Sequence, residues 1–169
     1  MEGILYIENF ISQPENLFQH LEGITWDERM ASRKTASFGV AYNYSQISYP
    51  EVAMPTEIEN IAKQIATVLD FEPNNCLINY YLDGKSKMGY HSDQIDILFE
   101  NTGIAIVSLG ITRILRFRNI QNPETIVDYP LPSGSLIYMN QEIQNLWHHA
   151  IPKGNTEEGR MSLTFRKIK

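Results

Sequence analysis

The residues best suited to metal or acid–base chemistry are a histidine and an aspartate separated by one position, His91 and Asp93. In an extended strand side chains alternate between two faces, so these two point to the same side. A neutral imidazole and a carboxylate supply two ligands of a facial metal triad, and a second histidine would complete it. This ligand set suits Fe(II), with the opposite coordination positions left open. The sequence therefore predicts an iron site that needs one more ligand and the walls of a pocket.

The third ligand must come from one of the other three histidines. His20 falls in a predicted early helix, on an expected surface turn, whereas His148 and His149 follow a predicted strand. Neighbouring residues of an extended segment face opposite ways, so only one of this pair can point into a pocket. Periodicity alone does not choose between them.

The last predicted strand, residues 160–167, carries two arginines on one face. Arg160 and Arg166 alternate with apolar residues and share their face with Ser162 and Thr164. Two buried guanidinium groups are costly unless an anion pairs with them, and their forked donors suit carboxylates. We therefore predict a small dicarboxylate ligand beside the metal, the alternative being an edge strand with solvated arginines.

The elements that must position these residues form two groups. We expect a helix over residues 14–21 capped by Ser12, and a second over 55–69 capped by Thr56. Residues 24–46 are predicted to be strand and loop. Short strands separated by turn residues are predicted at 3–10, 76–82, 104–109, 114–118, 126–129, 135–139 and 160–167. This order predicts an α+β fold, a double-stranded β-helix (jelly roll) with N-terminal helices packed on one sheet.

Composition narrows the class of protein. The 169 residues are expected to form a single domain, and their one cysteine, Cys76, permits no intrachain disulfide. Together with the absence of a basic signal-like start or a long apolar run, this predicts a cytoplasmic protein without membrane contact, and we expect a monomer. The net charge of -6 means that any nucleic-acid contact must use a local basic patch.

Six segments in order carry a family resemblance. The sequence resembles the AlkB family of Fe(II)/2-oxoglutarate dioxygenases, and the match spans about residue 30 to the end. The resemblance is specific because the segments occur in the family order and end in two arginines separated by five residues. The matching segments are 77–81 (LINYY), 91–93 (HSD), 104–110 (IAIVSLG), 131–136 (LPSGSL), 147–152 (WHHAIP) and 160–166 (RMSLTFR).

The resemblance implies roles for these residues. It places the third ligand at His149, and it implies that Arg160 and Tyr81 hold the distal carboxylate of 2-oxoglutarate. Arg166 and Asn79 would lie toward the end that chelates iron. The implied chemistry couples oxidation of 2-oxoglutarate by O2 to hydroxylation of a substrate C–H bond, with ascorbate as reductant in vitro.

The substrate implied by the resemblance is an alkylated base such as 1-methyladenine or 3-methylcytosine in single-stranded DNA or RNA. A base in a duplex would have to be flipped out of the stack. Residues 24–50 form the candidate substrate lid, with Arg33, Phe38 and Tyr42 as candidate substrate-binding residues.

One position departs from the repair enzymes of the family, which carry an acidic residue two places after the metal aspartate. Ile95 stands there and cannot hydrogen-bond a base, so either Asp96 has taken the role or the substrate differs. The first alternative is the same chemistry on a small molecule or a protein side chain. The second is a non-catalytic cupin-like binding module.

Overall fold

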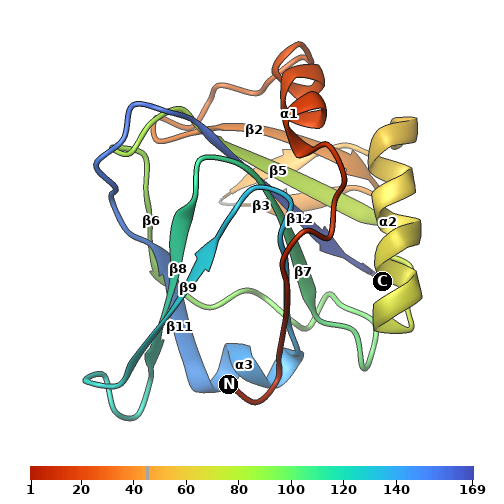
Figure 1. The fold of residues 1–169 in the computed structure, drawn as a ribbon. Coiled ribbons are helices and arrows are strands. Elements are labelled where there is room, and N and C mark those ends of the chain that lie inside the picture. Colours follow the sequence, from red (N-terminus) through yellow and green to blue (C-terminus); the bar gives the residue numbers. More distant parts are fainter. Residues whose placement is uncertain (45) are drawn as a thin grey trace.

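Two antiparallel sheets face one another and enclose the core (Figure 1). The computed structural model describes residues 1–44 and 46–169. In spatial order the larger sheet consists of β1 (Ile4–Ile7), β10 (Leu136–Met139), β7 (Ile104–Gly110), β12 (Arg160–Arg166), β5 (Asn75–Tyr81) and β2 (Lys34–Gly39). The smaller sheet consists of β6 (Met88–His91), β11 (Trp147–Ile151), β8 (Arg113–Asn119) and β9 (Ile126–Leu131). A separate pair is formed by β3 (Tyr42–Tyr44) and β4 (Ile47–Tyr49).

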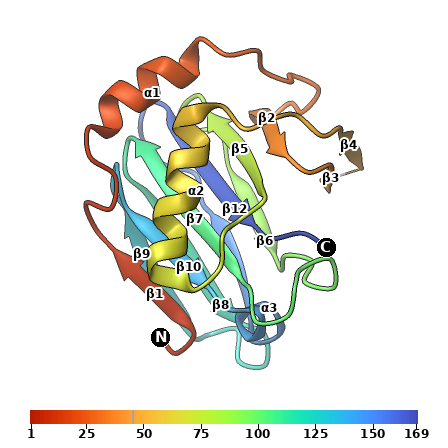
Figure 2. The ribbon, with the colours of Figure 1, turned by 90° about the vertical axis from the view of Figure 1, so that its right-hand side faces the viewer.

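Two helices cover the outer face of the larger sheet, as the sequence predicts (Figure 2). Helices α1 (Pro14–Glu22) and α2 (Thr56–Leu69) place their apolar stripes against the strands. The buried residues of this layer include Leu21, Ile58, Ile61 and Ile65 from the helices and Ile78, Val107, Met161, Leu163 and Phe165 from the strands. Burying this helix layer leaves the inner face of the same sheet free to line a pocket.

The helix starts differ from the prediction. Ser12 does not cap α1, because Gln13 holds the cap position in a left-handed conformation, φ 51°, and turns the chain directly before Pro14. Thr56 is the first residue of α2 rather than its cap, a position taken by Pro55. Neither helix has a side-chain cap hydrogen bond, so both rely on packing.

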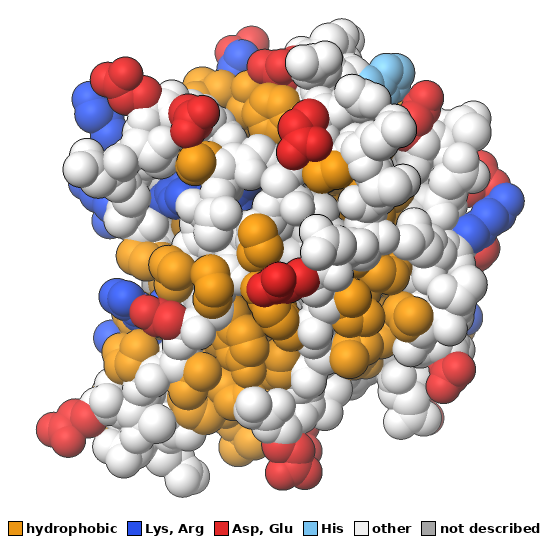
Figure 3. All heavy atoms as spheres, in the orientation of Figure 1, with side chains coloured by type: hydrophobic (Ala, Val, Ile, Leu, Met, Phe, Trp, Pro, Cys, Tyr) orange, Lys and Arg blue, Asp and Glu red, His pale blue; other side chains and the backbone are white. Residues whose placement is uncertain are grey.

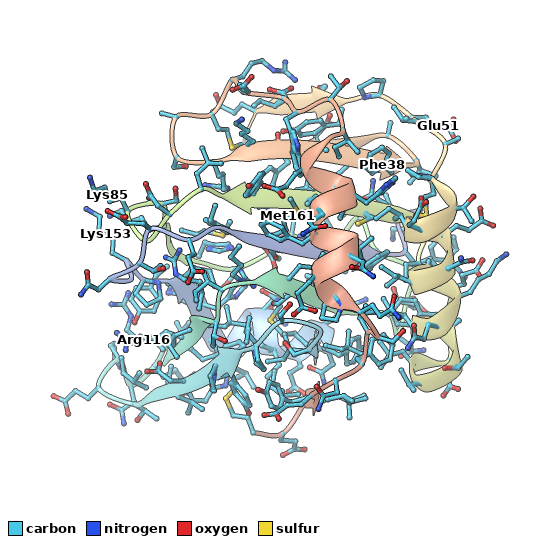
Figure 4. All side chains as sticks on the ribbon, turned by 45° about the horizontal axis from the view of Figure 1, so that its top comes forward. Phe38, Glu51, Lys85, Arg116, Lys153 and Met161 are labelled. Atoms are coloured by element: carbon cyan, nitrogen blue, oxygen red, sulfur yellow. The ribbon has the colours of Figure 1, made fainter. Side chains whose placement is uncertain are left out.

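The two-face pattern of the last strand is confirmed. Arg160 and Arg166 face the space between the sheets. Met161, which is labelled in Figure 4, and Phe165 face the helices. Strand β12 lies between β5 and β7 and pairs along its length with both, so its arginines are central to the sheet rather than at an edge. The alternative of an edge strand with solvated arginines is therefore wrong.

The sheet edges β1 and β9 approach each other on one side of the molecule. The hydroxyl of Tyr6 donates to the carbonyl of Pro130 at 2.6 Å, and the rings of Tyr6 and Tyr129 lie 5.7 Å apart. Leu5 of β1 and Ile126 of β9 are exposed. Apolar side chains gather on the face of the molecule that Figure 3 shows. The contacts of Tyr6 close the barrel at the edge where β1 and β9 meet.

One helix was not predicted from the sequence. Helix α3 (Gln141–Leu146) is six residues long and begins at Asn140, whose side chain accepts a hydrogen bond from the N–H of Ile143 at 3.2 Å. It leads directly into β11, which lies between β6 and β8.

None of the described helices is both long and apolar enough to cross a membrane.

Candidate metal and cosubstrate site

A β-bulge in β6 directs His91 into the space between the sheets. Met88 pairs with Ile151 and His91 with His149, so β6 carries one residue more than β11 between these pairs. An extra residue in one strand re-aims the side chain that follows it. The strand ends at His91, and Asp93 lies in the following loop. The prediction of one extended strand through both residues was therefore wrong, although both side chains do converge.

Three candidate ligands meet at this point. The Nε2 atoms of His91 and His149 lie 3.4 and 3.3 Å from the two carboxylate oxygens of Asp93. One ligand atom from each residue lies within 4.8 Å of the others. The Nδ1 atom of His91 lies 2.8 Å from the carbonyl of Gly89 and donates to it, which leaves Nε2 free to bind a metal.

The electrostatics of the three residues favour a bound cation. Burial alone would raise the pKa of Asp93, but hydrogen bonds from His149 and His91 and the charge of Arg166 hold it well below its usual range. Burial opposes protonation of His91, yet the hydrogen bond and negative charge of Asp93 raise the pKa of that imidazole. A divalent cation can take the place of the protons shared among these groups.

Asp93 is positioned by residues that the sequence did not single out. Its backbone N–H donates to the side-chain oxygen of Gln144 on α3 at 2.8 Å, and Gln144 is buried. Next to it, the hydroxyl of Ser92 donates to the carbonyl of Trp147 at 3.2 Å. The loop is thereby joined to the segment that carries His149. The Asn140 cap was the available sequence signal for α3.

Two buried arginines lie beside the triad with unused donors. Arg160 is 1% exposed and Arg166 is 3% exposed. Arg160 donates to the hydroxyl of Ser108 at 2.9 Å, but its Nε and Nη1 find no partner among the described residues, and the same is true of Arg166. Burial lowers the pKa of Arg160 to about 10. Unpaired N–H groups on buried cations are expensive, so this site fits an anion.

The positions of the arginines distinguish the two ends of such an anion. The Nη2 atom of Arg166 lies 3.8 Å from the carboxylate of Asp93, next to the candidate metal. Arg160 lies away from the triad, with its guanidinium 5.6 Å from the ring centroid of Tyr81. Ser108, which the sequence analysis missed, could have been found as the polar residue on the inner face of an otherwise apolar strand.

Asn79 and Tyr81 lie on the same inner face, as the sequence predicts. Both are buried, and the side-chain oxygen of Asn79 accepts a hydrogen bond from Nε of Arg33 at 2.9 Å. Arg33 also donates to the hydroxyl of Tyr44 at 2.5 Å. It therefore connects the candidate lid to the inner face of β5.

A single cavity joins these groups. It encloses about 490 Å³, its open side included. Its polar lining contains all three candidate metal ligands and the four predicted cosubstrate residues. The lining residues are Tyr44, Leu77, Asn79, Tyr81, Met88, His91, Asp93, Ile106, Leu115, Leu131, His149, Ala150, Ile151, Arg160, Ser162, Thr164 and Arg166.

The predicted substrate residues divide into two groups. Arg33 and Tyr42 lie beside the cavity, Tyr42 with its ring 4.9 Å from the guanidinium of Arg166. Phe38 points instead to the helix side of β2 and packs there, because the alternation of the strand turns it away (Figure 4). Asp96 is exposed and lies outside the cavity lining. Phe38 and Asp96 therefore do not line the cavity, and their role in substrate binding stays a prediction.

The candidate lid, residues 24–50, contains the end of the α1 connection and strands β2 to β4. Ser45 within it lies outside the described residues. Tyr44 is the aromatic residue of this segment that lines the cavity, and the sequence analysis did not rank it above the other aromatics. Ile95 packs on the apolar core between the sheets.

The remaining histidines lie where a surface role is expected. His20 is exposed on α1, with its Nε2 3.6 Å from a carboxylate oxygen of Glu57. His148 is half-buried and pairs with Arg118 of β8, on the face of β11 opposite to His149.

Comparison with known proteins agrees with this site. Residues 3–166 match the model of the 2OG-Fe(II) oxygenase superfamily. The mouse alpha-ketoglutarate-dependent dioxygenase alkB homolog 3 is 30% identical, with 90% of this chain and 60% of that protein covered. The human DNA oxidative demethylase ALKBH2 is 33% identical, with 80% of this chain and 56% of that protein covered. The chain thus spans somewhat over half the length of these relatives.

The fold is shared with a solved structure. The structure of OsALKBH1 superposes with a TM-score of 0.72 over 99% of both chains, at 15% sequence identity. This confirms the predicted jelly-roll core. The chain belongs to the 2OG-Fe(II) oxygenase superfamily, and its relatives there are AlkB homologues.

Proposed function

We propose that this chain is an Fe(II)- and 2-oxoglutarate-dependent dioxygenase that removes N-methyl groups from bases of single-stranded DNA or RNA. One observation carries the proposal: a His-Asp-His cluster shares a cavity with two buried arginines, each of which has two nitrogens without a partner among the described residues. That combination offers one place for a divalent metal and one for a dicarboxylate. The names of the related demethylases support a methylated base as substrate.

His91, Asp93 and His149 would hold Fe(II), which supplies activation of O2 when bound. Arg166 and Asn79 would orient the keto-acid end of 2-oxoglutarate toward the metal. Arg160, with Ser108 and Tyr81, would bind the distal carboxylate by charge-assisted hydrogen bonds. The buried walls of the cavity exclude water from the reacting groups.

The overall reaction is balanced by the cosubstrates. One oxygen atom of O2 enters succinate as 2-oxoglutarate loses CO2, and the other enters the substrate methyl group as a hydroxyl. The resulting N-hydroxymethyl group releases formaldehyde and leaves the unmodified base. Ascorbate would keep the iron reduced in vitro.

The base would enter at the side of the cavity formed by Tyr44 and His91, whose rings both line it. Aromatic side chains at such a position can stack on an unpaired base. Arg33 lies at the same side and carries a positive charge beside Tyr44. We expect this side to accept the 1-methyladenine or 3-methylcytosine type of lesion.

One observation favours the second candidate, the same chemistry on a small molecule or a protein side chain. Ile95 packs into the core and Asp96 is exposed, so neither offers a carboxylate to a base inside the cavity. A substrate without a cationic methylated ring would not need one.

Formaldehyde release separates the two candidates. The protein is incubated with Fe(II), ascorbate and 2-oxoglutarate, with single-stranded oligonucleotides that carry 1-methyladenine or 3-methylcytosine, and with unmethylated controls. Loss of one methyl mass with equimolar formaldehyde supports the nucleic-acid function. Succinate formed at the same rate with all oligonucleotides, without repair, would overturn it in favour of the second candidate.

A further inference from the structure

A positively charged groove lies on the outer face of the smaller sheet, in a protein whose net charge is -6. It encloses about 690 Å³, its open side included, and its charged lining residues are Lys87, Arg116 and Lys153. No carboxylate is among the described residues that line it. Lys85 extends the charge along the same side of the molecule (Figure 4). This is the local basic patch that an acidic chain needs in order to bind a polyanion.

The cations of the groove are available to a ligand to different degrees. Lys87 and Lys153 are exposed and form no ion pair with any described carboxylate. Arg116 binds Asp128 through two contacts of 2.8 and 2.9 Å, which fix the guanidinium in place and offset its positive charge with the negative charge of the carboxylate. The guanidinium of Arg118 stacks on the ring of Tyr90, 3.8 Å from its centroid. The two lysines are therefore the free charges.

The groove and the reaction cavity share a wall. Met88, Ala150 and Ile151 line both, from opposite sides of β6 and β11. Tyr90 lines the groove and its neighbour His91 lines the cavity. Because β6 is the edge strand of its sheet, an extended chain can pass over its free edge from one side to the other.

We propose that this groove binds the phosphate backbone of the substrate strand next to the nucleotide whose base occupies the cavity, with Lys87 and Lys153 as the phosphate contacts. The inference rests on the proposed function and adds to it the path of the strand. Tyr90 offers a ring for an adjacent base, and its stacking with Arg118 keeps that ring oriented. Single-stranded nucleic acid is commonly bound by this pairing of a cationic groove with an aromatic residue.

The test compares binding and turnover of the double variant Lys87→Ala/Lys153→Ala with those of the wild type. The control is Lys63→Ala, an exposed lysine on α2 that pairs with Glu59. Binding of a fluorescent single-stranded methylated oligonucleotide is followed by anisotropy over a range of salt concentrations, and melting temperature reports folding. Turnover is measured on the same oligonucleotide and on free 1-methyladenosine.

Each lost phosphate contact lowers the slope of log affinity against log salt by roughly 0.7, so the double variant should lose about 1.4. We expect KM for the oligonucleotide to rise about three- to tenfold, with turnover of free 1-methyladenosine unchanged. Lys63→Ala should match the wild type in every measurement.

Two results would overturn the inference and are distinguishable. If the wild type repairs the oligonucleotide and the double variant has the same salt slope and KM, the groove does not bind the phosphate backbone, although the proposed function stands. If the wild type neither binds nor repairs any oligonucleotide while producing succinate, both the proposed function and the proposed phosphate-binding groove are wrong.

Discussion

His148 and His149 are neighbours in sequence with opposite environments. His149 lies in the cavity with its Nε2 3.3 Å from Asp93, whereas His148 lies on the other face of β11. Even groups that only support a metal ligand change affinity by 10- to 100-fold. We therefore predict that His149→Ala lowers affinity for Mn(II) or Fe(II) by at least about a hundredfold and abolishes succinate formation. Anaerobic titration calorimetry and succinate assays measure both.

The matched control is His148→Ala, which removes the same chemical group one residue away. It should retain wild-type metal affinity and most activity. Equal losses in the two variants would mean that the face of β11 toward the metal has been assigned wrongly.

Arg160 is a buried cation that is only partly satisfied, since two of its nitrogens have no partner in the described part of the chain. Replacing a buried ion pair by apolar residues of similar volume is often neutral or stabilising by about 1–4 kcal/mol, because the cost of desolvating the charges is removed, and the same cost applies to a buried arginine without a carboxylate partner. Arg160→Met should therefore raise the melting temperature of the ligand-free protein. It should also raise KM for 2-oxoglutarate at least about tenfold, since a charge-assisted contact contributes about 1.5–3 kcal/mol.

The opposite signs of these two effects make the prediction specific to an anion-binding role. A merely structural arginine would give a variant that is less stable and has an unchanged KM. The KM of Arg160→Lys for 2-oxoglutarate should lie between those of the wild type and Arg160→Met, because lysine keeps the charge and loses the forked pair of donors. An unchanged KM in Arg160→Met would move the main carboxylate contact to Arg166.

At the scale of elements, the site depends on one extra residue in β6. The bulge between the Met88 and His91 pairs lets both side chains point inward although they are three positions apart. Deleting Gly89 should remove the bulge, and it also removes the carbonyl that accepts the hydrogen bond from Nδ1 of His91 and orients that ring. We expect metal affinity to fall by at least about tenfold while the circular dichroism spectrum is retained.

Gly89→Ala is the control for the deletion. A methyl group added at Gly89 would have no atom within 4 Å, and the backbone there does not have positive φ. This substitution should leave metal binding and melting temperature at wild-type values. Wild-type metal affinity in the deletion variant would show that the loop before β6 supplies the missing residue.

The elements that could be predicted from sequence are those with a strong period. The apolar stripe of α2 and the alternation of β12 each specify a face, and the structure confirms both. Helix α3 could not be found because six residues carry too little periodicity, and its role depends on a contact from Gln144 to a distant loop. The bulge in β6 was missed because a strand pattern gives no count of the residues in its partner.

Lid residues were predicted least well, for the same physical reason. Phe38, Tyr42 and Tyr44 are aromatic residues in one short segment, and composition alone treats them alike. In the structure Phe38 packs beside α2, Tyr42 covers Arg166, and Tyr44 lines the cavity. The face that Phe38 takes is set by the pairing of β2 with β5, whereas Tyr42 and Tyr44 lie on β3, which pairs with β4.

At the scale of the whole molecule, the cavity holds charged groups from both sheets, and a ligand that binds these groups together would stabilise the folded state. Asp93 and His91 come from the smaller-sheet side, and Arg160 and Arg166 from the larger sheet. A ligand that binds only the folded state at one hundred times its Kd adds about 2.7 kcal/mol of stability. For a protein of this size that corresponds to a rise in melting temperature of about 5–10 °C. We predict this shift for 2-oxoglutarate with Mn(II), measured without O2 by scanning fluorimetry.

Two comparisons identify which end of the ligand produces the shift. Succinate lacks the keto acid that chelates a metal but keeps a distal carboxylate, so it should give a smaller shift that persists in EDTA. Arg160→Met should lose most of the succinate shift and retain the shift caused by Mn(II) alone, because the metal ligands are untouched. If 2-oxoglutarate raised the melting temperature of Arg160→Met as much as that of the wild type, the buried arginine would not be the carboxylate site. The unused donors would then require another partner.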